Sequence, residues 1–217
     1  MSLKNRLLQL QDQIDGALKR TGRTSVRLVV VTKYQSIETT WELYNLGVRE
    51  FGESRVIDAL KKVDSLPQDI SWHLIGTLQK NKVNKVVGNF SLIHSVDSVE
   101  LAQKISQTAS RERKRVSLLL QVNPLQEATK HGFSLDDLEG AYAQIKNLPS
   151  LDIKGLMAMA PKGDDNLVRQ AFSETAKLFS RLRTPVFSEL SMGMSRDFEL
   201  AIECGATIIR VGSSLFS

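Results

Sequence analysis

The stretch Leu28-Val29-Val30-Val31-Thr32-Lys33-Tyr34-Gln35-Ser36 decides the predicted fold, because an apolar β-branched run leads into a polar turn that contains no glycine. Seven further strand-like runs follow, and amphipathic helical stretches separate successive runs. This alternation is typical of a (β/α)8 barrel or of a doubly wound sheet. A doubly wound nucleotide-binding sheet carries a glycine-rich turn after its first strand. The glycine-free turn therefore favours an α/β fold with a single (β/α)8 TIM barrel.

The remaining elements follow from hydrophobic periodicity and from start signals. The expected strands span residues 28–32, 50–52, 72–75, 92–95, 117–122, 153–157, 187–190 and 208–211. Helical periodicity is clearest at residues 39–46, 99–111 and 166–182. Asp97 with Glu100, and Ser134 with Asp137, resemble capping boxes, in which two side chains satisfy the first amides of a helix.

An extra helix is predicted before the first strand. Its apolar positions recur at steps of three and four residues: Leu3, Leu7, Leu10, Ile14 and Ala17. Gly22 follows this stripe and is a suitable C-terminal stop. We expect the helix to cover the outside or the bottom of the barrel.

Length alone permits one or two domains, and the short connections favour a single globular domain that spans residues 1–217. Hydrophobic residues make up 41% and charged residues 24% of the chain, which are ordinary globular values. The connections between elements are short, and no linker or low-complexity tract interrupts them. Because a closed barrel exposes no strand edge, we expect a monomer.

Several classes of protein are disfavoured by composition. The net charge is +5, but basic residues are mixed with acidic ones and aromatics make up only 6%, so no nucleic-acid partner is expected. Cys204 is the only cysteine, which excludes an intrachain disulfide and a cysteine metal cluster. No signal peptide and no membrane-spanning apolar run are recognisable. A cytoplasmic protein without a membrane partner is the expectation.

Lys33 is the first candidate functional residue, because chemistry in a TIM barrel collects at the C-terminal ends of the strands. A lysine at a strand end is commonly a surface residue. Inside a barrel mouth, removal from water and nearby positive charge favour the neutral amine that forms a Schiff base. Arg210, at the eighth strand, could supply part of that charge. An arginine facing a pyridine nitrogen would also keep that nitrogen unprotonated and weaken an electron sink.

Two glycine–serine turns follow the seventh and eighth strands, where barrels often bind phosphate. Their glycines allow close backbone approach and their hydroxyls add donors: Ser191, Gly193, Ser195, Gly212, Ser213 and Ser214. The alternative is that these residues only cap helices and form turns. Since the two turns belong to neighbouring strands, the sequence predicts a phosphate site.

A series of motifs makes the chain resemble a known family over nearly its whole length. The matching stretches are Val30-Val-Thr-Lys33, Phe51-Gly-Glu-Ser-Arg55, Trp72-His-Leu-Ile-Gly-Thr-Leu-Gln-Lys-Asn-Lys82, His94-Ser-Val-Asp97, Gln121-Val-Asn123, Glu127-Ala-Thr-Lys-His-Gly132, Gly155-Leu-Met-Ala158, Leu190-Ser-Met-Gly-Met-Ser-Arg-Asp197 and Arg210-Val-Gly-Ser213. In this order they resemble the pyridoxal phosphate homeostasis (YggS/PROSC) family, whose fold is similar to the barrel domain of alanine racemase.

The resemblance implies pyridoxal 5′-phosphate as cofactor, held as a covalent aldimine on Lys33. It implies that the phosphate lies among the seventh- and eighth-strand turns: Ser191, Gly193, Ser195, Gly212 and Ser213. It implies Arg210 beside the ring nitrogen. Ser54, His73 and Asn123 are further candidates for the cofactor pocket. No catalytic residue and no metal site are expected.

The chain departs from the family pattern at three places. Ser54 stands where relatives usually carry asparagine, so a side-chain amide near the cofactor is replaced by a hydroxyl. Ala206 stands where relatives usually carry serine, and the chain ends at Phe216-Ser217 where they usually continue a little. The lysine, the arginine and the phosphate turns are all present.

The resemblance implies a cofactor-binding protein of intracellular vitamin B6 and amino-acid homeostasis, without robust turnover, with apo pyridoxal phosphate enzymes as candidate recipients. The alternative is a racemase-like enzyme, which needs acid–base groups on both faces of its substrate; Tyr34 is the closest candidate for the second group. A third reading is a cofactor-free barrel enzyme that uses Lys33 on a sugar phosphate. Lys80 and Lys82 either cover a helix surface or form a secondary anion site.

Overall fold

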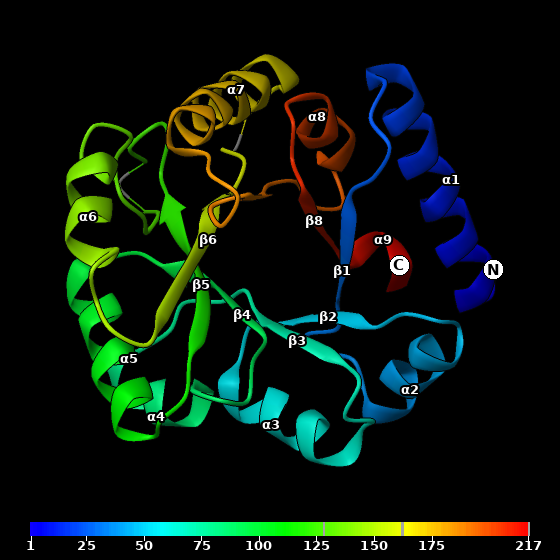
Figure 1. The fold of residues 1–217 in the computed structure, drawn as a ribbon. Helices are drawn as coiled ribbons and strands as arrows, with labels where there is room; N and C mark the ends of the chain where they lie inside the picture. The colour runs from blue at the N-terminus through cyan, green and yellow to red at the C-terminus, as the bar shows by residue number, and fades with distance from the viewer. Residues whose placement is uncertain (128, 162, 217) are drawn as a thin grey trace.

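The computed structural model describes residues 1–127, 129–161 and 163–216, and its strands close into the predicted parallel barrel. Each strand pairs with the next, and the first also pairs with the eighth. Figure 1 looks along the barrel, with the helices arranged around the strands. The strands are β1 (Arg27–Val31), β2 (Glu50–Glu53), β3 (Ser71–Leu74), β4 (Leu92–Val96), β5 (Val116–Val122), β6 (Leu151–Ala158), β7 (Glu189–Ser191) and β8 (Ile208–Val211).

The helices follow the strands around the outside of the barrel. They are α1 (Leu3–Thr21), α2 (Ile37–Asn45), α3 (Val56–Ser65), the 3-10 turn η1 (Lys80–Lys82), α4 (Val83–Val86), α5 (Val99–Arg111), α6 (Leu138–Ile145), α7 (Asp165–Leu182), α8 (Phe198–Glu203) and α9 (Ser213–Phe216). None of the helices in the described ranges is both long enough and apolar enough to cross a bilayer.

The predicted strands and helices are confirmed, and the majority of their ends differ from the prediction by one or two residues. The seventh strand begins at Glu189 rather than at Phe187. Phe187 instead closes a turn with Thr184, whose hydroxyl accepts the Phe187 amide hydrogen at 3.0 Å. The predicted α5 cap at Asp97 is wrong, because the adjacent Ser98 hydroxyl accepts the Leu101 amide hydrogen. The Ser134–Asp137 bonds form as predicted, but in the turn before α6.

The strand residues alternate between two layers. One apolar cluster lies between the strands and the helices, and includes Trp72, Leu74 and Ile93 together with buried side chains from every long helix. A second, smaller cluster consists of strand residues alone: Val29, Leu92, Leu119, Met157 and Ile208. Because successive strand residues face opposite sides, this second cluster fills part of the barrel interior. His73 and His94 alternate with the outer residues and therefore also face inward.

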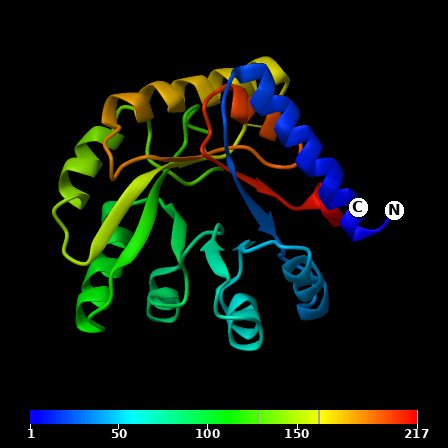
Figure 2. The same ribbon diagram turned by 45° about the vertical axis from the view of Figure 1, so that its right-hand side comes forward.

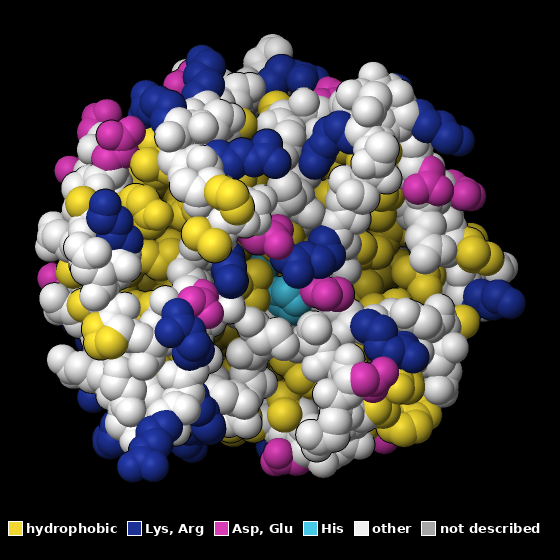
Figure 3. Space-filling view, viewed as in Figure 1, with side chains coloured by type: hydrophobic (Ala, Val, Ile, Leu, Met, Phe, Trp, Pro, Cys, Tyr) yellow, Lys and Arg dark blue, Asp and Glu magenta, His cyan; other side chains and the backbone are white. Residues whose placement is uncertain are grey.

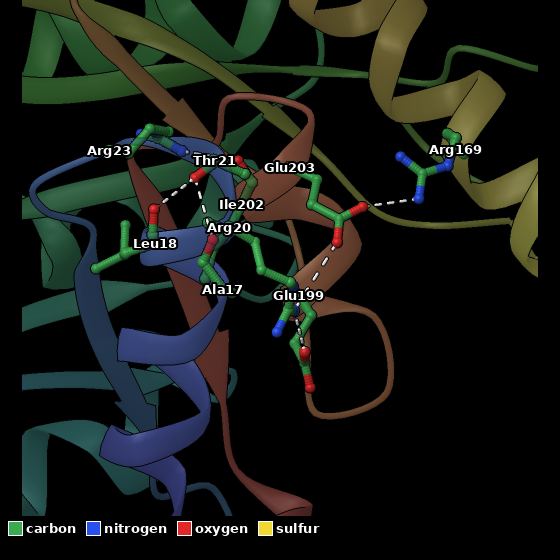
Figure 4. Close-up of polar contacts among 9 residues, drawn as sticks. All are labelled: Ala17, Leu18, Arg20, Thr21, Arg23, Arg169, Glu199, Ile202 and Glu203. Atoms are coloured by element: carbon green, nitrogen blue, oxygen red, sulfur yellow. Dashed lines mark hydrogen bonds and ion pairs between the residues drawn. The ribbon is translucent and has the colours of Figure 1, made fainter.

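The N-terminal helix packs against the outside of the barrel, beside α8 and α9, and does not cover the bottom (Figure 2). Ser2 caps its start and Gly22, in the left-handed conformation, ends it as predicted. Figure 4 shows the polar contacts that accompany this packing. Arg20 forms an ion pair with Glu199 at 2.5 Å, and Arg23 donates to the Ile202 carbonyl at 2.9 Å. Helix α1 thus supports α8, which follows the turn after β7.

Candidate functional site

A cavity of about 500 Å³ opens at the C-terminal ends of β1, β7 and β8. The predicted site residues and one acid contribute to its lining: Lys33, Ser195, Asp197, Arg210, Gly212 and Ser213. The register of β1 explains the place of the lysine. Val29 belongs to the interior cluster and Val31 lines the cavity, so Lys33, two residues further, faces the same side.

Lys33 itself is exposed, so the expected removal of its amine from water is wrong in this structure. The turn after β1 holds the next residue, Tyr34, at a φ of 71°, which is rare for a residue with a side chain. Its ring lies 6.0 Å from the Lys33 amine and 5.1 Å from the Arg55 guanidinium. A neighbouring cavity of about 390 Å³ shares Lys33 and Tyr34 with the first, so this turn forms the wall between them.

The two glycine–serine turns meet at one hydroxyl oxygen. The Ser195 Oγ accepts the amide hydrogens of Gly212 at 3.2 Å and of Ser214 at 3.4 Å. A Cβ atom at position 212 would lie 2.8 Å from the Val31 carbonyl oxygen, so the close approach of β1 and this turn requires glycine. Backbone amides that converge on an oxygen are the chemistry expected of an anion site.

Gly193 supports this site from behind and does not line the cavity. Its φ is 91°, and an added Cβ would lie 2.9 Å from the Phe198 Cα atom. Its carbonyl accepts the Arg210 amide hydrogen at 3.0 Å, which joins the two turns. Glycine is therefore needed at this position for the backbone path of the turn.

Arg210 lies below the cavity and is 4% exposed. Its guanidinium donates to the Ser191 hydroxyl at 2.6 Å and to the Ala158 carbonyl at 3.0 Å. Burial lowers the pKa of Arg210 to about 10, and the nearby Asp197 carboxylate opposes that change. Burial also raises the pKa of Asp197. The hydrogen bond from the Met194 amide and the positive charges of Arg210 and Lys130 oppose this rise. The arginine stays charged at neutral pH.

Ser191 does not line the cavity, although it was predicted as a phosphate ligand. Its side chain is fully buried in the barrel interior, where its hydroxyl bonds to Arg210 and to His94 at 2.9 Å. His73, at 1% exposure, lies deeper and contacts Glu50 and His94. Ser191 and His73 are therefore connected to the cavity indirectly, through Arg210.

Ser54 and Asn123 also lie apart from the main cavity. Ser54 lines the neighbouring cavity. Asn123 binds the backbone of its own loop, donating to the Glu127 and Lys130 carbonyls and accepting the Glu127 amide hydrogen. The loop motif quoted above contains Ala128, and the chain end contains Ser217; both lie outside the described residues.

A buried ion pair beside the site was not predicted from the sequence. The Lys62 amine lies 2.6 Å from the Glu53 carboxylate and donates to the Thr32 carbonyl at 2.8 Å. The Thr32 hydroxyl donates to the same carboxylate at 2.7 Å. Lys62 was indistinguishable from the other helix lysines in sequence, since only the packing of α3 on β1 and β2 brings it inside. The pair fixes the backbone just before Lys33.

Metal chemistry finds no support in the described part of the chain, where no three His, Cys, Asp or Glu side chains are grouped to hold an ion. His131 lies 3.3 Å from Asp97 at the surface. His73 and His94 contact each other with ring centroids 5.1 Å apart. His73 and His94 thus contact each other inside the barrel, whereas His131 pairs with Asp97 at its surface.

Comparisons with known proteins agree with this geometry. Residues 6–217 match the family model of the alanine racemase N-terminal domain. The pyridoxal phosphate homeostasis protein of Synechocystis is 41% identical, over 88% of this chain and 91% of that protein. The structure of PipY from Synechococcus elongatus with PLP bound is 36% identical, with a TM-score of 0.87 over the full length of both chains. An alanine racemase of Clostridium difficile, 14% identical, shares the fold over 95% of this chain and 55% of that chain with a TM-score of 0.73. The chain therefore belongs to the pyridoxal phosphate homeostasis proteins of the alanine racemase N-terminal domain family.

Proposed function

We propose that this chain binds pyridoxal 5′-phosphate as a Schiff base on Lys33 and takes part in intracellular vitamin B6 and amino-acid homeostasis, without robust turnover of its own. When bound, the cofactor supplies an aldehyde that condenses with a primary amine, and a phosphate. The observation that carries the proposal is that one cavity is lined by Lys33, by the turn residues Ser195, Gly212 and Ser213, and by the buried Arg210. The relatives' names and the PLP-bound PipY structure support the same ligand.

The residues present fit this cofactor. A cavity of about 500 Å³ falls in the size range of small-molecule sites. The amides of Gly212 and Ser214 already converge on an oxygen atom, that of Ser195, and phosphate oxygens are stronger acceptors of such bonds. In this proposal these turns bind the phosphate, with Ser195 and Ser213, while Ser191 and Gly193 hold the turn and the arginine from behind.

Arg210 determines which chemistry the site favours. A guanidinium has only donors, and burial leaves this one charged at neutral pH. It could donate a hydrogen bond to the ring nitrogen of a bound cofactor, which would keep that nitrogen unprotonated and weaken the ring as an electron sink. The site therefore suits holding and releasing the cofactor better than stabilising carbanions. Release to the amine of an apo enzyme, with this chain as a cytoplasmic monomer, completes the proposal.

The test is a titration of the purified protein with pyridoxal phosphate, followed by absorbance and gel filtration. We expect retained cofactor at one equivalent, and roughly tenfold or more weaker binding of pyridoxal, which lacks the phosphate. Lys33→Ala should abolish the absorbance of the bound form, while Lys61→Ala, in the neighbouring cavity, should not. Equal binding by both lysine variants would overturn the assignment.

A racemase-like activity remains the second candidate, because Tyr34 lines the cavity beside Lys33. Its side chain is 77% exposed, however, which is a poor environment for a phenol that must hold or accept a proton. Incubation of the loaded protein with L-alanine and chiral analysis separates the two functions. Sustained D-alanine formation that Tyr34→Phe removes would favour the enzyme.

A further inference from the structure

A continuous chain of polar contacts crosses the interior of the barrel. The Glu50 carboxylate lies 2.5 Å from His73 Nε2, and His73 Nδ1 lies 2.9 Å from His94 Nε2. His94 Nδ1 lies 2.9 Å from the Ser191 hydroxyl, which accepts from Arg210 at 2.6 Å. Both histidines, the serine and the arginine are at most 4% exposed. We call these five residues the interior chain.

The two ends of the interior chain reach different cavities. Arg210 borders the proposed cofactor cavity. Glu50 and His73 border a cavity of about 150 Å³ at the N-terminal ends of the strands. Charged residues of both signs share that cavity: Arg27, Lys154 and Glu189. Figure 3 shows such a combination, a histidine side chain in the central hollow between acidic and basic side chains.

The positions of the hydrogens follow from what each group can do. Arginine only donates, and an ionised carboxylate only accepts, so the two ends of the interior chain are fixed. If both histidines are neutral, His73 donates from Nε2 to Glu50 and accepts at Nδ1. His94 then donates from Nε2 to His73 and accepts at Nδ1 from the Ser191 hydroxyl. Every bond runs in one direction, from Arg210 to Glu50.

A second arrangement would add one proton to His73 and reverse the next two bonds. His94 would then donate from Nδ1 to Ser191, whose oxygen would accept twice while its own hydrogen lost its partner. This arrangement also places a second positive charge inside a barrel that already holds Arg210, in a chain whose one carboxylate is Glu50. Burying that charge and leaving a buried hydroxyl hydrogen unpaired both cost free energy. The neutral, one-directional arrangement is favoured.

We infer that Glu50, His73 and His94 are positioning residues of the cofactor site, which orient the Arg210 guanidinium through Ser191 from the opposite end of the barrel. The Ser191 hydrogen is committed to His94, so its oxygen is left to accept from Arg210. The second guanidinium nitrogen is held by the Ala158 carbonyl. With two of its nitrogens fixed, Arg210 can present only one edge to the cavity. The bearing on the cofactor rests on the proposed function above.

The test uses nitrogen-15 NMR of the histidine rings and of the Arg210 side chain in the cofactor-free full chain. We expect His73 and His94 each to carry hydrogen on Nε2 alone at neutral pH, and slow exchange of the Arg210 guanidinium hydrogens. Glu50→Leu removes the final acceptor, so the single His73 tautomer and the slow Arg210 exchange should be lost. Glu50→Gln keeps an acceptor and should restore both. Glu189→Gln, an acid of the same cavity outside the interior chain, is the matched control.

A second readout is the midpoint of the pH titration of the bound cofactor's absorbance. Glu50→Leu should shift it by about half a pH unit or more, and Glu50→Gln and Glu189→Gln should leave it nearly unchanged. Hydrogen on His94 Nδ1 in the wild type would overturn the inference, as would a Glu50→Leu protein that behaves like Glu189→Gln. A protein with the expected NMR pattern that binds no cofactor would leave the interior chain standing and reject the proposed function instead.

Discussion

Between the strands and the helices the packing is hydrocarbon, with Phe51, Phe172 and Phe187 fully buried there, whereas the space inside the barrel also holds two histidines, a serine and an arginine. The side chains of this outer layer come from both the helices and the strands. The interior is apolar only where its own small cluster lies. Side chains in both regions are almost fully buried, so burial alone does not account for their different composition.

The difference separates stability from function. Hydrocarbon packing stabilises the fold in proportion to the apolar area it buries, and it tolerates exchange of one apolar residue for another. A buried polar chain contributes little net stability, because desolvation opposes its hydrogen bonds, but it holds its groups in fixed orientations. The outer layer therefore stabilises the barrel. The polar residues of the interior orient side chains at the C-terminal ends of the strands, where a ligand would bind. Substitutions in the two regions should fail in different ways.

The largest loss of stability is expected in the outer layer. Phe172→Ala removes a fully buried ring from α7 and should lower the free energy of unfolding by about 3–5 kcal/mol. Molecules that remain folded should still bind cofactor normally. Urea denaturation measures the first effect and cofactor titration the second. Leu8→Ala, at a half-exposed position of α1, is the control and should change little.

Breaking the buried Lys62–Glu53 pair, at the C-terminal ends of the strands, should lower both the stability of the fold and the affinity for cofactor. Lys62→Met leaves the Glu53 charge uncompensated, which should cost about 3 kcal/mol, the lower end for such pairs because a cavity adjoins it. Cofactor affinity should fall as well, since the pair fixes the strand end before Lys33. Adding Glu53→Gln should recover most of the stability. If the double variant were as unstable as the single one, the lost charge balance would not be the cause.

The interior should make the protein sensitive to acid. Burial, then the neighbouring His73 ring and the positive charges of Arg210 and Arg27, hold the pKa of His94 well below its usual 6.5. The unfolded chain therefore binds this proton more readily, and stability should fall as the pH drops below about 6.5. The pKa of Glu50 is also lowered: burial raises it, but the hydrogen bond and electrostatic attraction of the His73 ring, together with the Arg27 charge, outweigh burial. That part is lost at lower pH, as the carboxylate protonates.

Urea midpoints at pH 7 and pH 5 measure this acid sensitivity. His94→Gln should be less stable than the wild type at pH 7 but should lose less between the two values. Parallel losses in both proteins would show that His94 does not carry the effect.

The smallest effect is expected at the surface of the outer layer, where α1 meets α8 (Figure 4). Arg20 and Glu199 are 53% and 43% exposed, so their ion pair should be worth less than about 1 kcal/mol. Arg20→Ala should change the thermal midpoint slightly and the cofactor affinity not at all. A larger change would mean that α1 supports the seventh-strand turn through this contact.

The sequence was sufficient to predict the helices and strands and the closure of the strands into a barrel. Val29 and Val31 alternate with outward-facing residues and lead directly to Lys33, and the missing glycine in the next turn excluded the competing sheet. The glycine–serine turns were recognisable because glycine is required where backbones approach closely, as at Gly212. Short-range spacing therefore predicted the residues that line the cavity.

The interior chain could not be predicted in this way. Periodicity indicates that His73 and His94 face inward, but not that His94 meets Ser191, which lies on a strand across the barrel. Such contacts depend on the tilt and stagger of all eight strands together. For the same reason Ser191 was predicted as a phosphate ligand, although its side chain turns into the barrel. Lys62 likewise became a site residue only through helix packing.

The most direct measurement is peptide mapping by mass spectrometry after incubation with pyridoxal phosphate and reduction with borohydride. We expect one pyridoxyl group per chain on the peptide that contains Lys33, and none on that peptide in Lys33→Ala. Absence of the adduct in the wild type, or label scattered over surface lysines, would contradict it. The C-terminal cavity would then need another ligand.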